Sequence, residues 1–353
     1  MPPITAMPPM ADCPLPWPAN ATVRLGHGSG GKLTQQLLNE IFLPGFDNPW
    51  LQQAHDAVLL NISDQHTIFT TDSFVVQPLF FSGGDIGRLA VYGTVNDLAM
   101  AGARPLYLSC GFILEEGLPL ETLARVVDSM QQAARETGVH LVAGDTKVVE
   151  KGKGDGLYIN TSGIGVPLSE RPICPQNIEP GDAILLSGDI GRHGIAVMAQ
   201  REGLEFDNPL QSDCGELFSP VNSLLAAGRP LHCLRDLTRG GLATALVELA
   251  ETTGYSLTLN EVAVPVSAAV QGACEMLGLD PLHVANEGRF IAFVPEAHAE
   301  DCLATLKEHV ISAEACIIGR VLNENQSQVV MKTLVGSERL LDRLPGEQLP
   351  RIC

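Results

Sequence analysis

The chain has 353 residues, 45% of them hydrophobic, and its 22 basic and 41 acidic residues give a net charge of −19. This is enough apolar material for a packed core, and the length predicts two domains. The negative surface repels nucleic acid and anionic membranes, so we expect neither as a partner. A site for an anionic substrate would need a local cationic group or a bound metal ion.

Cysteine usage and the first residues indicate where the protein works. The nine cysteines are widely spaced and form no Cys-x-x-Cys pair that would support a zinc or iron–sulfur site. Scattered cysteines in a chain of this size are typical of a reduced, cytoplasmic protein. Residues 1–20, MPPITAMPPMADCPLPWPAN, are proline-rich and lack the pattern of a signal peptide, so we expect a disordered arm.

Helix and strand patterns mix over residues 21–167, which we assign to a first domain. A helical spacing of leucine and isoleucine predicts a helix over 33–42. Further helices are expected over 85–103 and 119–138, the second ending at Gly138, a typical C′ glycine. Strands are predicted over residues 56–62, 66–76, 105–114, 140–145 and 157–166. Adjacent strands interspersed with helices favour an α+β domain over a regular parallel βαβ arrangement.

A proline-rich, polar stretch over 166–182 breaks the pattern and places a boundary near residue 168. A second α+β domain is expected over 168–335, with helices near 219–228 and 297–309. Its last strands are predicted over 315–322 and 328–334. The remaining residues, 336–353, contain two prolines that disfavour a long helix, so we expect a mobile tail that carries Cys353 at its end.

The glycine-rich segment over residues 26–32, GHGSGGK, admits three interpretations. It fits the dinucleotide pattern G-x-G-x-x-G, but no regular βαβ unit follows it. It also fits G-x-x-x-x-G-K, although Leu33 stands where such a loop carries Ser or Thr. The third interpretation is a flexible loop whose backbone N–H groups close over phosphates. A simple turn before a helix is the structural alternative.

Five aspartates lie beside strands or in turns within apolar or glycine-rich surroundings: Asp56, Asp72, Asp97, Asp145 and Asp236. One such aspartate is usually a cap or turn residue, but five are harder to explain in that way. Converging carboxylates would bind Mg²⁺, and Mg²⁺ would bind nucleotide phosphates.

Two further residues are candidates for chemistry. Lys147, two residues after Asp145, is either a group that polarises a carbonyl or holds a phosphoryl oxygen, or a solvated lysine. Glu287, in ANEGRF, precedes a glycine and an apolar strand. It is either a general base or the acid of a turn.

Taken together, the motifs GHGSGGK, TTDSF, GTVNDLAMAGA, CGFILEEG, VAGDTKVV, DLTRGGLA, NEGRF and LPRIC resemble those of the hydrogenase maturation factor HypE from about Leu25 to Cys353. Those near Asp72, Asp97 and Asp236 also look like aminoimidazole ribonucleotide synthetase, selenophosphate synthetase and thiamine-monophosphate kinase. The terminal Pro-Arg-Ile-Cys separates HypE from these relatives. The resemblance implies a two-domain aminoimidazole ribonucleotide synthetase-like fold and a homodimer whose N-terminal halves pair into a β-barrel near the ATP site.

The resemblance also implies a reaction. In HypE-like proteins the terminal cysteine receives a carbamoyl group from the partner HypF, and ATP drives dehydration of the thiocarboxamide to a thiocyanate. The cyanide then passes to iron on the HypC–HypD complex, toward the [NiFe]-hydrogenase active site. We therefore expect ATP and Mg²⁺ as cofactors and Cys353 as the carrier.

Site residues follow from this expectation. Cys353, Lys147 and Glu287 are the catalytic candidates, as carrier, polarising group and base. The candidates for binding the nucleotide are Gly28, Ser29, Gly30, Gly31, Asp72, Thr94, Asn96, Asp97, Asp145 and Asp236. The candidates for binding the metal are Asp56, Asp72, Asp97, Asp145 and Asp236.

Two other functions remain open at this point. One is a related ATP-dependent synthetase or kinase that acts on a free small molecule and leaves Cys353 idle. A selenophosphate synthetase would be expected to carry a catalytic cysteine or selenocysteine beside a lysine in the glycine loop, and GHGSGGK has none. The other is a scaffold that binds nucleotide only to order partner surfaces.

Overall fold

The computed structural model describes residues 31–37, 39–40, 55–62, 65–203, 210–344, 349 and 351–353. The expected arm over 1–20 and the candidates Gly28, Ser29 and Gly30 lie outside these residues. Gly31 is described, and helix α1 (Lys32–Leu37) begins directly after it. Among the described residues, no helix combines the length and the apolarity that crossing a membrane requires.

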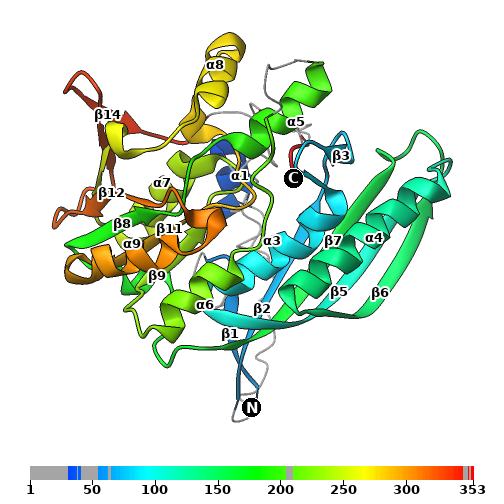
Figure 1. Cartoon of the computed structure of the whole chain (residues 1–353), viewed down its shortest axis with the longest axis horizontal. Helices are drawn as coiled ribbons and strands as arrows, with labels where there is room; N and C mark the ends of the chain where they lie inside the picture. The colour runs from blue at the N-terminus through cyan, green and yellow to red at the C-terminus, as the bar shows by residue number, and fades with distance from the viewer. Residues whose placement is uncertain are drawn as a thin grey trace, which may run out of the picture.

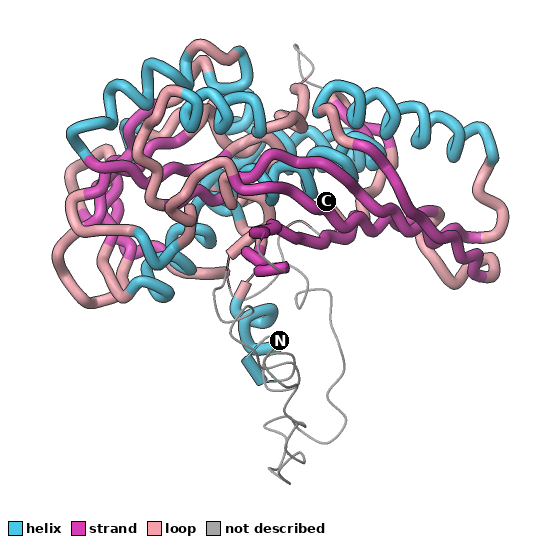
Figure 2. Tube along the Cα trace, turned by 90° about the horizontal axis from the view of Figure 1, so that it is seen from below, coloured by secondary structure: helices cyan, strands magenta, loops and turns pink. Residues whose placement is uncertain are grey.

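The first half is a five-stranded sheet in the order β1-β2-β7-β5-β6. The strands are β1 (Val58–Ile62), β2 (Gln65–Phe74), β5 (Ala103–Glu115), β6 (His140–Val149) and β7 (Leu157–Pro167). Strands β5 and β6 run parallel, and the other neighbours run antiparallel. Helices α3 (Ile86–Met100) and α4 (Leu120–Thr137) lie on one side of this sheet (Figures 1 and 2). The mixture confirms the predicted α+β class.

Local sequence explains both helices. Asp85 caps α3, because its side chain accepts hydrogen bonds from the backbone N–H groups of Gly87 and Arg88. Helix α4 ends at Gly138, whose φ of 72° is the left-handed conformation that glycine adopts at little cost. Both predicted helices are therefore confirmed. Almost all of α3 is buried, and a Cβ at Gly93 would lie 2.8 Å from the ring of Phe74, so the helix needs a glycine to pack this closely.

The second half is built on a seven-stranded sheet in the order β14-β13-β10-β12-β8-β11-β9. Its strands are β8 (Asp182–Leu186), β9 (Cys233–Asp236), β10 (Leu257–Asn260), β11 (Phe290–Pro295), β12 (Cys316–Val321), β13 (Val329–Lys332) and β14 (Glu338–Leu341). Its helices are α5 (Arg192–Glu202), α6 (Phe218–Ala226), α7 (Gly241–Thr253), α8 (Ala268–Leu277) and α9 (Ala299–Lys307).

Several short elements complete the described chain. Strands β3 (Phe80–Phe81) and β4 (Gly84–Asp85) pair with each other. The 3₁₀ helices are Pro175–Asn177, Glu261–Ala263, Pro281–His283, Glu296–His298 and Val310–Ser312.

Helix α3 joins the two halves. The side chain of Asn96 donates to the backbone oxygen of Gly215 at 3.1 Å and accepts from the backbone nitrogen of Leu217 at 2.8 Å. Residues of α3 also lie close to β9 and α6. The end of β9 and the middle of α3 therefore meet where the two sheets adjoin (Figure 1).

The C-terminal segment begins later than the expected boundary at residue 336. Strand β14 pairs antiparallel with β13, and Leu341 is buried, so residues 338–341 belong to the second sheet. The expected boundary falls in the turn of this hairpin. The chain then returns to the junction of the two halves, where Figure 1 places the C-terminus beside β3.

Candidate active site at the domain junction

The last three residues lie against the segment that follows β2. The backbone nitrogen of Val75 donates to the backbone oxygen of Cys353 at 3.1 Å, and that of Gln77 donates to the oxygen of Arg351 at 3.2 Å. The side chain of Ile352 is buried in an apolar cluster that includes Phe74. Cys353 is half-buried and is thus held against the rest of the chain in this structure, whereas the sequence predicted only a mobile carrier.

The thiol of Cys353 lies in hydrogen-bonding contact with Glu287. Burial, and after it the negative charge of Glu287, raises the pKa of the thiol well above its usual value, although Arg239 works in the opposite direction. Burial likewise raises the pKa of Glu287, and the charges of Asp236 and Asp72 add to this effect. The structure therefore brings together two of the three catalytic candidates.

Four of the five predicted aspartates converge near this thiol. Asp56 precedes β1, Asp72 lies on β2, Asp97 on α3, and Asp236 ends β9. Burial raises the pKa of Asp56 to about 6 and that of Asp236 to about 8. Burial, followed by repulsion from Asp236, Asp72 and Asp56, also raises the pKa of Asp97 well above its usual value. These carboxylates repel one another, and the cluster contains too little positive charge to offset this repulsion.

Two arginines offset part of the negative charge of this acidic cluster. Arg235 pairs with Asp56 at 3.0 Å, and Arg239 lies 4.0 Å from Asp72. The hydroxyl of Thr70 donates to Asp97 at 2.8 Å. The second carboxylate oxygen of Asp56 is buried and has no hydrogen-bond partner among the described residues. A cation could therefore still find ligands in this cluster.

The cluster is not a closed metal cage. Within the described part of the chain, no three His, Cys, Asp or Glu side chains are arranged so that they could hold a metal ion by themselves. Mg²⁺ commonly binds through one or two carboxylates together with substrate phosphates. The acidic cluster therefore fits a magnesium ion that arrives with a nucleotide.

Asp145 and Lys147 lie elsewhere. Both are on β6, three strands from β2, which is about 14 Å at a strand spacing of about 4.8 Å. Their side chains are exposed and pair with each other at 2.5 Å, and this bond lowers the pKa of Asp145. They line a cavity of about 320 Å³ together with Ser73, Val75 and Asn160. Asp145 and Lys147 are therefore separate from the acidic cluster of the same chain. They adjoin the segment after β2, to which the last residues of the chain bind.

The remaining candidates have protein partners. Thr94 is buried and hydrogen-bonds to Thr161, and Asn96 makes the contacts between the two halves described above. Gly31 is buried, and its backbone oxygen accepts a hydrogen bond from the nitrogen of Gln35 in α1. None of these contacts tests nucleotide binding, which remains a prediction for all three residues.

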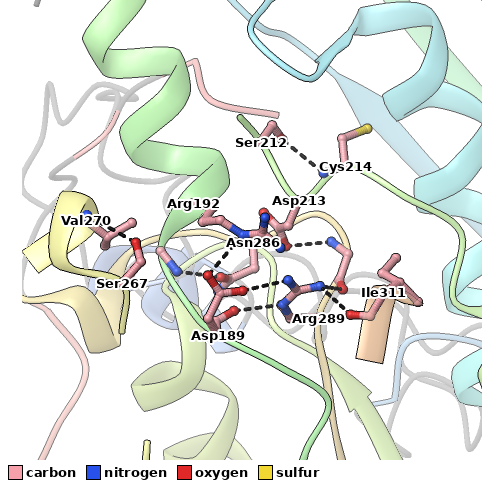
Figure 3. A network of polar contacts seen from close by, with 12 residues as sticks. Asp189, Arg192, Ser212, Asp213, Cys214, Ser267, Val270, Asn286, Arg289 and Ile311 are labelled. Carbon is pink, nitrogen blue, oxygen red and sulfur yellow. Dashed lines mark hydrogen bonds and ion pairs between the residues drawn. The ribbon is translucent and has the colours of Figure 1, made fainter. Parts of the chain in front are cut away.

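Figure 3 shows a network of polar contacts that includes Asp213, Asn286 and Arg289. This network fixes the turn that carries Glu287. One carboxylate oxygen of Asp213 accepts from the backbone nitrogens of Glu287 at 3.2 Å and Gly288 at 2.9 Å. The next residue, Arg289, is buried and pairs with Asp189 at 2.7 Å. Glu287 is therefore placed by its main chain, and its carboxylate is left available to the sulfur of Cys353.

Several residues of the site were not singled out in the sequence. Arg239 lies within the highlighted segment DLTRGGLA, three residues after Asp236, and its proximity to acids was the available signal. Asp213, His193 and Arg201 gave no such signal. The contacts of His193 and Arg201 with the tail join residues 159 and 150 positions apart. Local patterns carry no information about such distant partners.

Comparison with known proteins defines the class. Two family models match: AIR synthase related protein, N-terminal domain, over residues 54–167, and AIR synthase related protein, C-terminal domain, over residues 179–332. A structure of the Aquifex aeolicus thiamine monophosphate kinase shares this fold at 16% identity, with a TM-score of 0.63, over 89% of this chain and 99% of that chain. The chain therefore has the two-domain fold of the AIR synthase-related proteins.

More similar proteins define the family. Carbamoyl dehydratase HypE of Cupriavidus necator is 50% identical over 94% of this chain and 95% of its own. That of Escherichia coli K12 is 45% identical over 94% and 99%. A crystal structure of HypE in complex with ATP has 49% identity and a TM-score of 0.79, covering 93% of this chain and 98% of that one. A HypE–HypF complex has 46% identity and a TM-score of 0.83, covering 87% and 99%. This chain belongs to the HypE family of carbamoyl dehydratases.

Proposed function

We propose that this chain is an ATP-dependent carbamoyl dehydratase of hydrogenase maturation, and that Cys353 carries its substrate. The observation that carries the proposal is the position of the Cys353 thiol. It touches the buried carboxylate of Glu287 at the junction where four aspartates converge. The membership in the HypE family and the similarity to HypE bound to ATP support the same activity.

The reaction converts a thiocarboxamide on Cys353 and ATP into a thiocyanate, ADP and phosphate. Hydroxide is a poor leaving group at neutral pH, so the amide oxygen must first be made into a phosphate ester. The oxygen attacks the terminal phosphorus of ATP and ADP leaves. The carbon–oxygen bond then breaks, phosphate departs with the oxygen, and the nitrogen loses both of its protons as the C≡N bond forms.

Glu287 is the proposed base for this elimination. Its carboxylate touches the sulfur, so it lies near any group attached to that sulfur. A raised pKa makes it a better proton acceptor than an ordinary glutamate once it is ionised. We retain Lys147 as the predicted polarising group, reaching the nucleotide through the cavity that it shares with Val75. Arg239, whose positive charge acts on the thiol, is a second candidate for this role.

The aspartates are the proposed nucleotide and metal ligands. Asp56, Asp72, Asp97 and Asp236 would hold Mg²⁺ together with the phosphates, and Asp145 would contact the nucleotide from β6. When bound, Mg²⁺ would neutralise charge on the phosphates and on the crowded carboxylates. The raised pKa values of the cluster support this assignment, because burial and mutual repulsion make these carboxylates favourable ligands for an added cation.

The proposed partners are HypF as carbamoyl donor, the HypC–HypD complex as cyanide acceptor, and a second copy of this chain. The structure of a HypE–HypF complex supports the first of these. Support for the homodimer comes from β6, an end strand of the described sheet, which exposes Leu141, Val142 and Val148. Pairing of two such sheets would bury these side chains, as in the predicted β-barrel. The cytoplasmic location remains a prediction.

The domain roles are proposed accordingly. Residues 21–167 would bind ATP and form the dimer, residues 168–335 would supply Glu287 and Asp236, and the segment ending in Cys353 would move between partners. One thiol can then meet HypF, the ATP site and the iron acceptor in turn.

ATP turnover tests the proposed function against its alternatives. The enzyme should hydrolyse ATP only when Cys353 carries a carbamoyl group, with one ATP consumed per group. A kinase or synthetase for a free small molecule would not depend on the tail. A scaffold would bind ATP without hydrolysing it, whatever the state of the tail. Phosphate release from carbamoylated and unmodified protein separates the three functions.

A further inference from the structure

Helix α5 holds the main chain of the tail at two successive residues. The Nε2 atom of His193 lies 2.8 Å from the backbone oxygen of Ile352. In the last turn of the same helix, the guanidinium of Arg201 donates to the backbone oxygen of Arg351 at 2.7 Å and to that of Gln77. The two side chains stand eight residues apart, so they lie about 12 Å apart along the helix.

The contacts of His193 define its protonation. A carbonyl oxygen only accepts, so Nε2 must carry the hydrogen in this contact. The Nδ1 atom then accepts from the hydroxyl of Ser212 at 2.8 Å, and the oxygen of Ser212 accepts from the backbone nitrogen of Cys214 at 3.0 Å. Burial lowers the pKa of His193, which keeps the ring neutral. The imidazole is fully buried and packs edge-on against Phe81 at 5.3 Å between ring centroids.

These contacts make a recognition site rather than a chance surface contact. Ile352 is 4% exposed, and Arg351 pairs with Asp155 at 2.5 Å. Arg351 has a φ of 54°, a left-handed conformation that is unfavourable for a residue other than glycine. The chain bends there against this cost, and the surrounding bonds must hold the bend. After the bend, Ile352 is the one residue between Arg351, whose carbonyl Arg201 holds, and Cys353, whose thiol contacts Glu287.

We propose that His193 is a positioning residue for the dehydration and that Arg201 assists it: by fixing the carbonyls of Ile352 and Arg351, they set the group on Cys353 against Glu287. This inference rests on the proposed function. It assigns no contact of either side chain with the reacting atoms. Loss of these hydrogen bonds to the tail should slow dehydration, which needs Cys353 in the site. It should not slow carbamoylation, for which the tail must leave the site to meet HypF.

Two isosteric substitutions separate the two ring nitrogens. His193→Gln keeps an N–H donor near the position of Nε2 and so can still hold Ile352. His193→Asn places its amide near Nδ1, where it keeps the contact with Ser212 and loses the tail. The protein is first carbamoylated with HypF and carbamoyl phosphate. ATP is then added at saturation, and conversion of carbamoyl to cyano is followed by mass spectrometry of the C-terminal peptide in a single turnover.

The expected result is a difference between the two variants. His193→Asn should slow dehydration by roughly 10- to 100-fold, because a small displacement of a reacting group has effects of that size. His193→Gln should retain most of the rate. ATP affinity should stay unchanged in both, and carbamoylation by HypF should not slow. His298→Ala, at an exposed histidine in the second half, is the matched control and should match the unaltered protein.

Three results would overturn the inference. The first is an equal rate of dehydration in His193→Asn and in the unaltered protein. The second is a dehydration rate that His193→Asn retains and His193→Gln loses. The third is a loss of carbamoylation by HypF that is as large as the loss of dehydration. If the buried substitutions do not fold, Arg201→Met, at a less buried position, removes the second anchor and should slow dehydration in the same selective way. An unaltered protein that forms no cyano product would instead contradict the proposed function, whatever the variants do.

Discussion

Glu287 combines burial, contact with Cys353 and one carboxylate oxygen that has no hydrogen-bond partner among the described residues. We expect Glu287→Gln to bind ATP normally and to accumulate carbamoylated Cys353. Because the pKa of Glu287 is raised, the rate of dehydration should increase as the pH rises through that pKa and the carboxylate becomes available. Normal conversion in Glu287→Gln, seen in the mass of the C-terminal peptide, would remove Glu287 from the mechanism.

Lys147 has a weaker structural case, because it is exposed and paired with Asp145. Its predicted role still requires that Lys147→Ala accumulate carbamoylated Cys353 while binding ATP. Lys153→Ala, on the nearby turn, serves as the control for loss of a surface charge. If Lys147→Ala converts normally while Arg239→Ala does not, the polarising cation is Arg239.

Asp236 gives a prediction about stability. Burial and repulsion from Asp56 raise its pKa from 3.8 to about 8, so between these values the folded chain holds a proton that the unfolded chain has lost. This contribution to stability is complete below the unfolded pKa and disappears as the pH approaches the folded one. Asp236→Asn should therefore flatten the pH dependence of unfolding and add about 1–3 kcal/mol of stability in mildly alkaline buffer.

Urea unfolding of nucleotide-free protein at several pH values measures this effect. The same variant should lose ATP turnover if the carboxylate binds the nucleotide. A variant that is less stable than the unaltered protein at alkaline pH would show that the charge of Asp236 is adequately compensated, which would contradict the electrostatic account of the cluster.

At the scale of elements, the turn from Asn286 to Arg289 determines where Glu287 points. A Cβ at Gly288 would lie 1.9 Å from the backbone oxygen of Asp213, so this position cannot accept a side chain without moving the turn. Gly288→Ala should destabilise the protein by about 1–3 kcal/mol and slow dehydration. Gly272→Ala is the control, since a Cβ there meets no described atom within 4 Å and alanine favours its helix, α8.

Thermal unfolding and the single-turnover rate together test this prediction. Gly288→Ala should lose both stability and rate, whereas Gly272→Ala should lose neither. Full activity in Gly288→Ala would mean that the turn does not position Glu287.

The sequence predicted some parts of the fold and of the site and missed others. Helices α3 and α4 follow from the long segments over 85–103 and 119–138, and Gly138 marked a real end. Asp56, Asp72 and Asp236 lie beside or on strands, as their sequence surroundings predicted, but the expectation was wrong for Asp97, which lies within helix α3. Asp145 and Lys147 do not join them, because β6 lies three strands away from β2, and the order of strands in a sheet is not local information. The tail was expected to be mobile because its two prolines disfavour a long helix, yet Ile352 is part of the core.

For the whole molecule, the exposed apolar side chains of β6 predict association. Val142→Lys places a charge on this end strand and should convert the proposed homodimer into monomers, because charged residues on an end strand oppose pairing with another chain. Val310→Lys, at a residue that is 96% exposed in the second half, should leave the dimer intact. Sedimentation velocity distinguishes the two forms. A dimer that persists in Val142→Lys would place the interface elsewhere.

The proposed function depends on one terminal thiol, which carries the carbamoyl group and on which that group is dehydrated. The most direct measurement is the mass of the C-terminal peptide after incubation with HypF, carbamoyl phosphate and ATP, in the unaltered chain and in Cys353→Ala. We expect a cyano mass on this peptide in the unaltered chain, and neither a carbamoyl nor a cyano mass in Cys353→Ala, which should still fold and bind ATP. A carbamoyl or cyano mass on another peptide, with activity retained in Cys353→Ala, would contradict it.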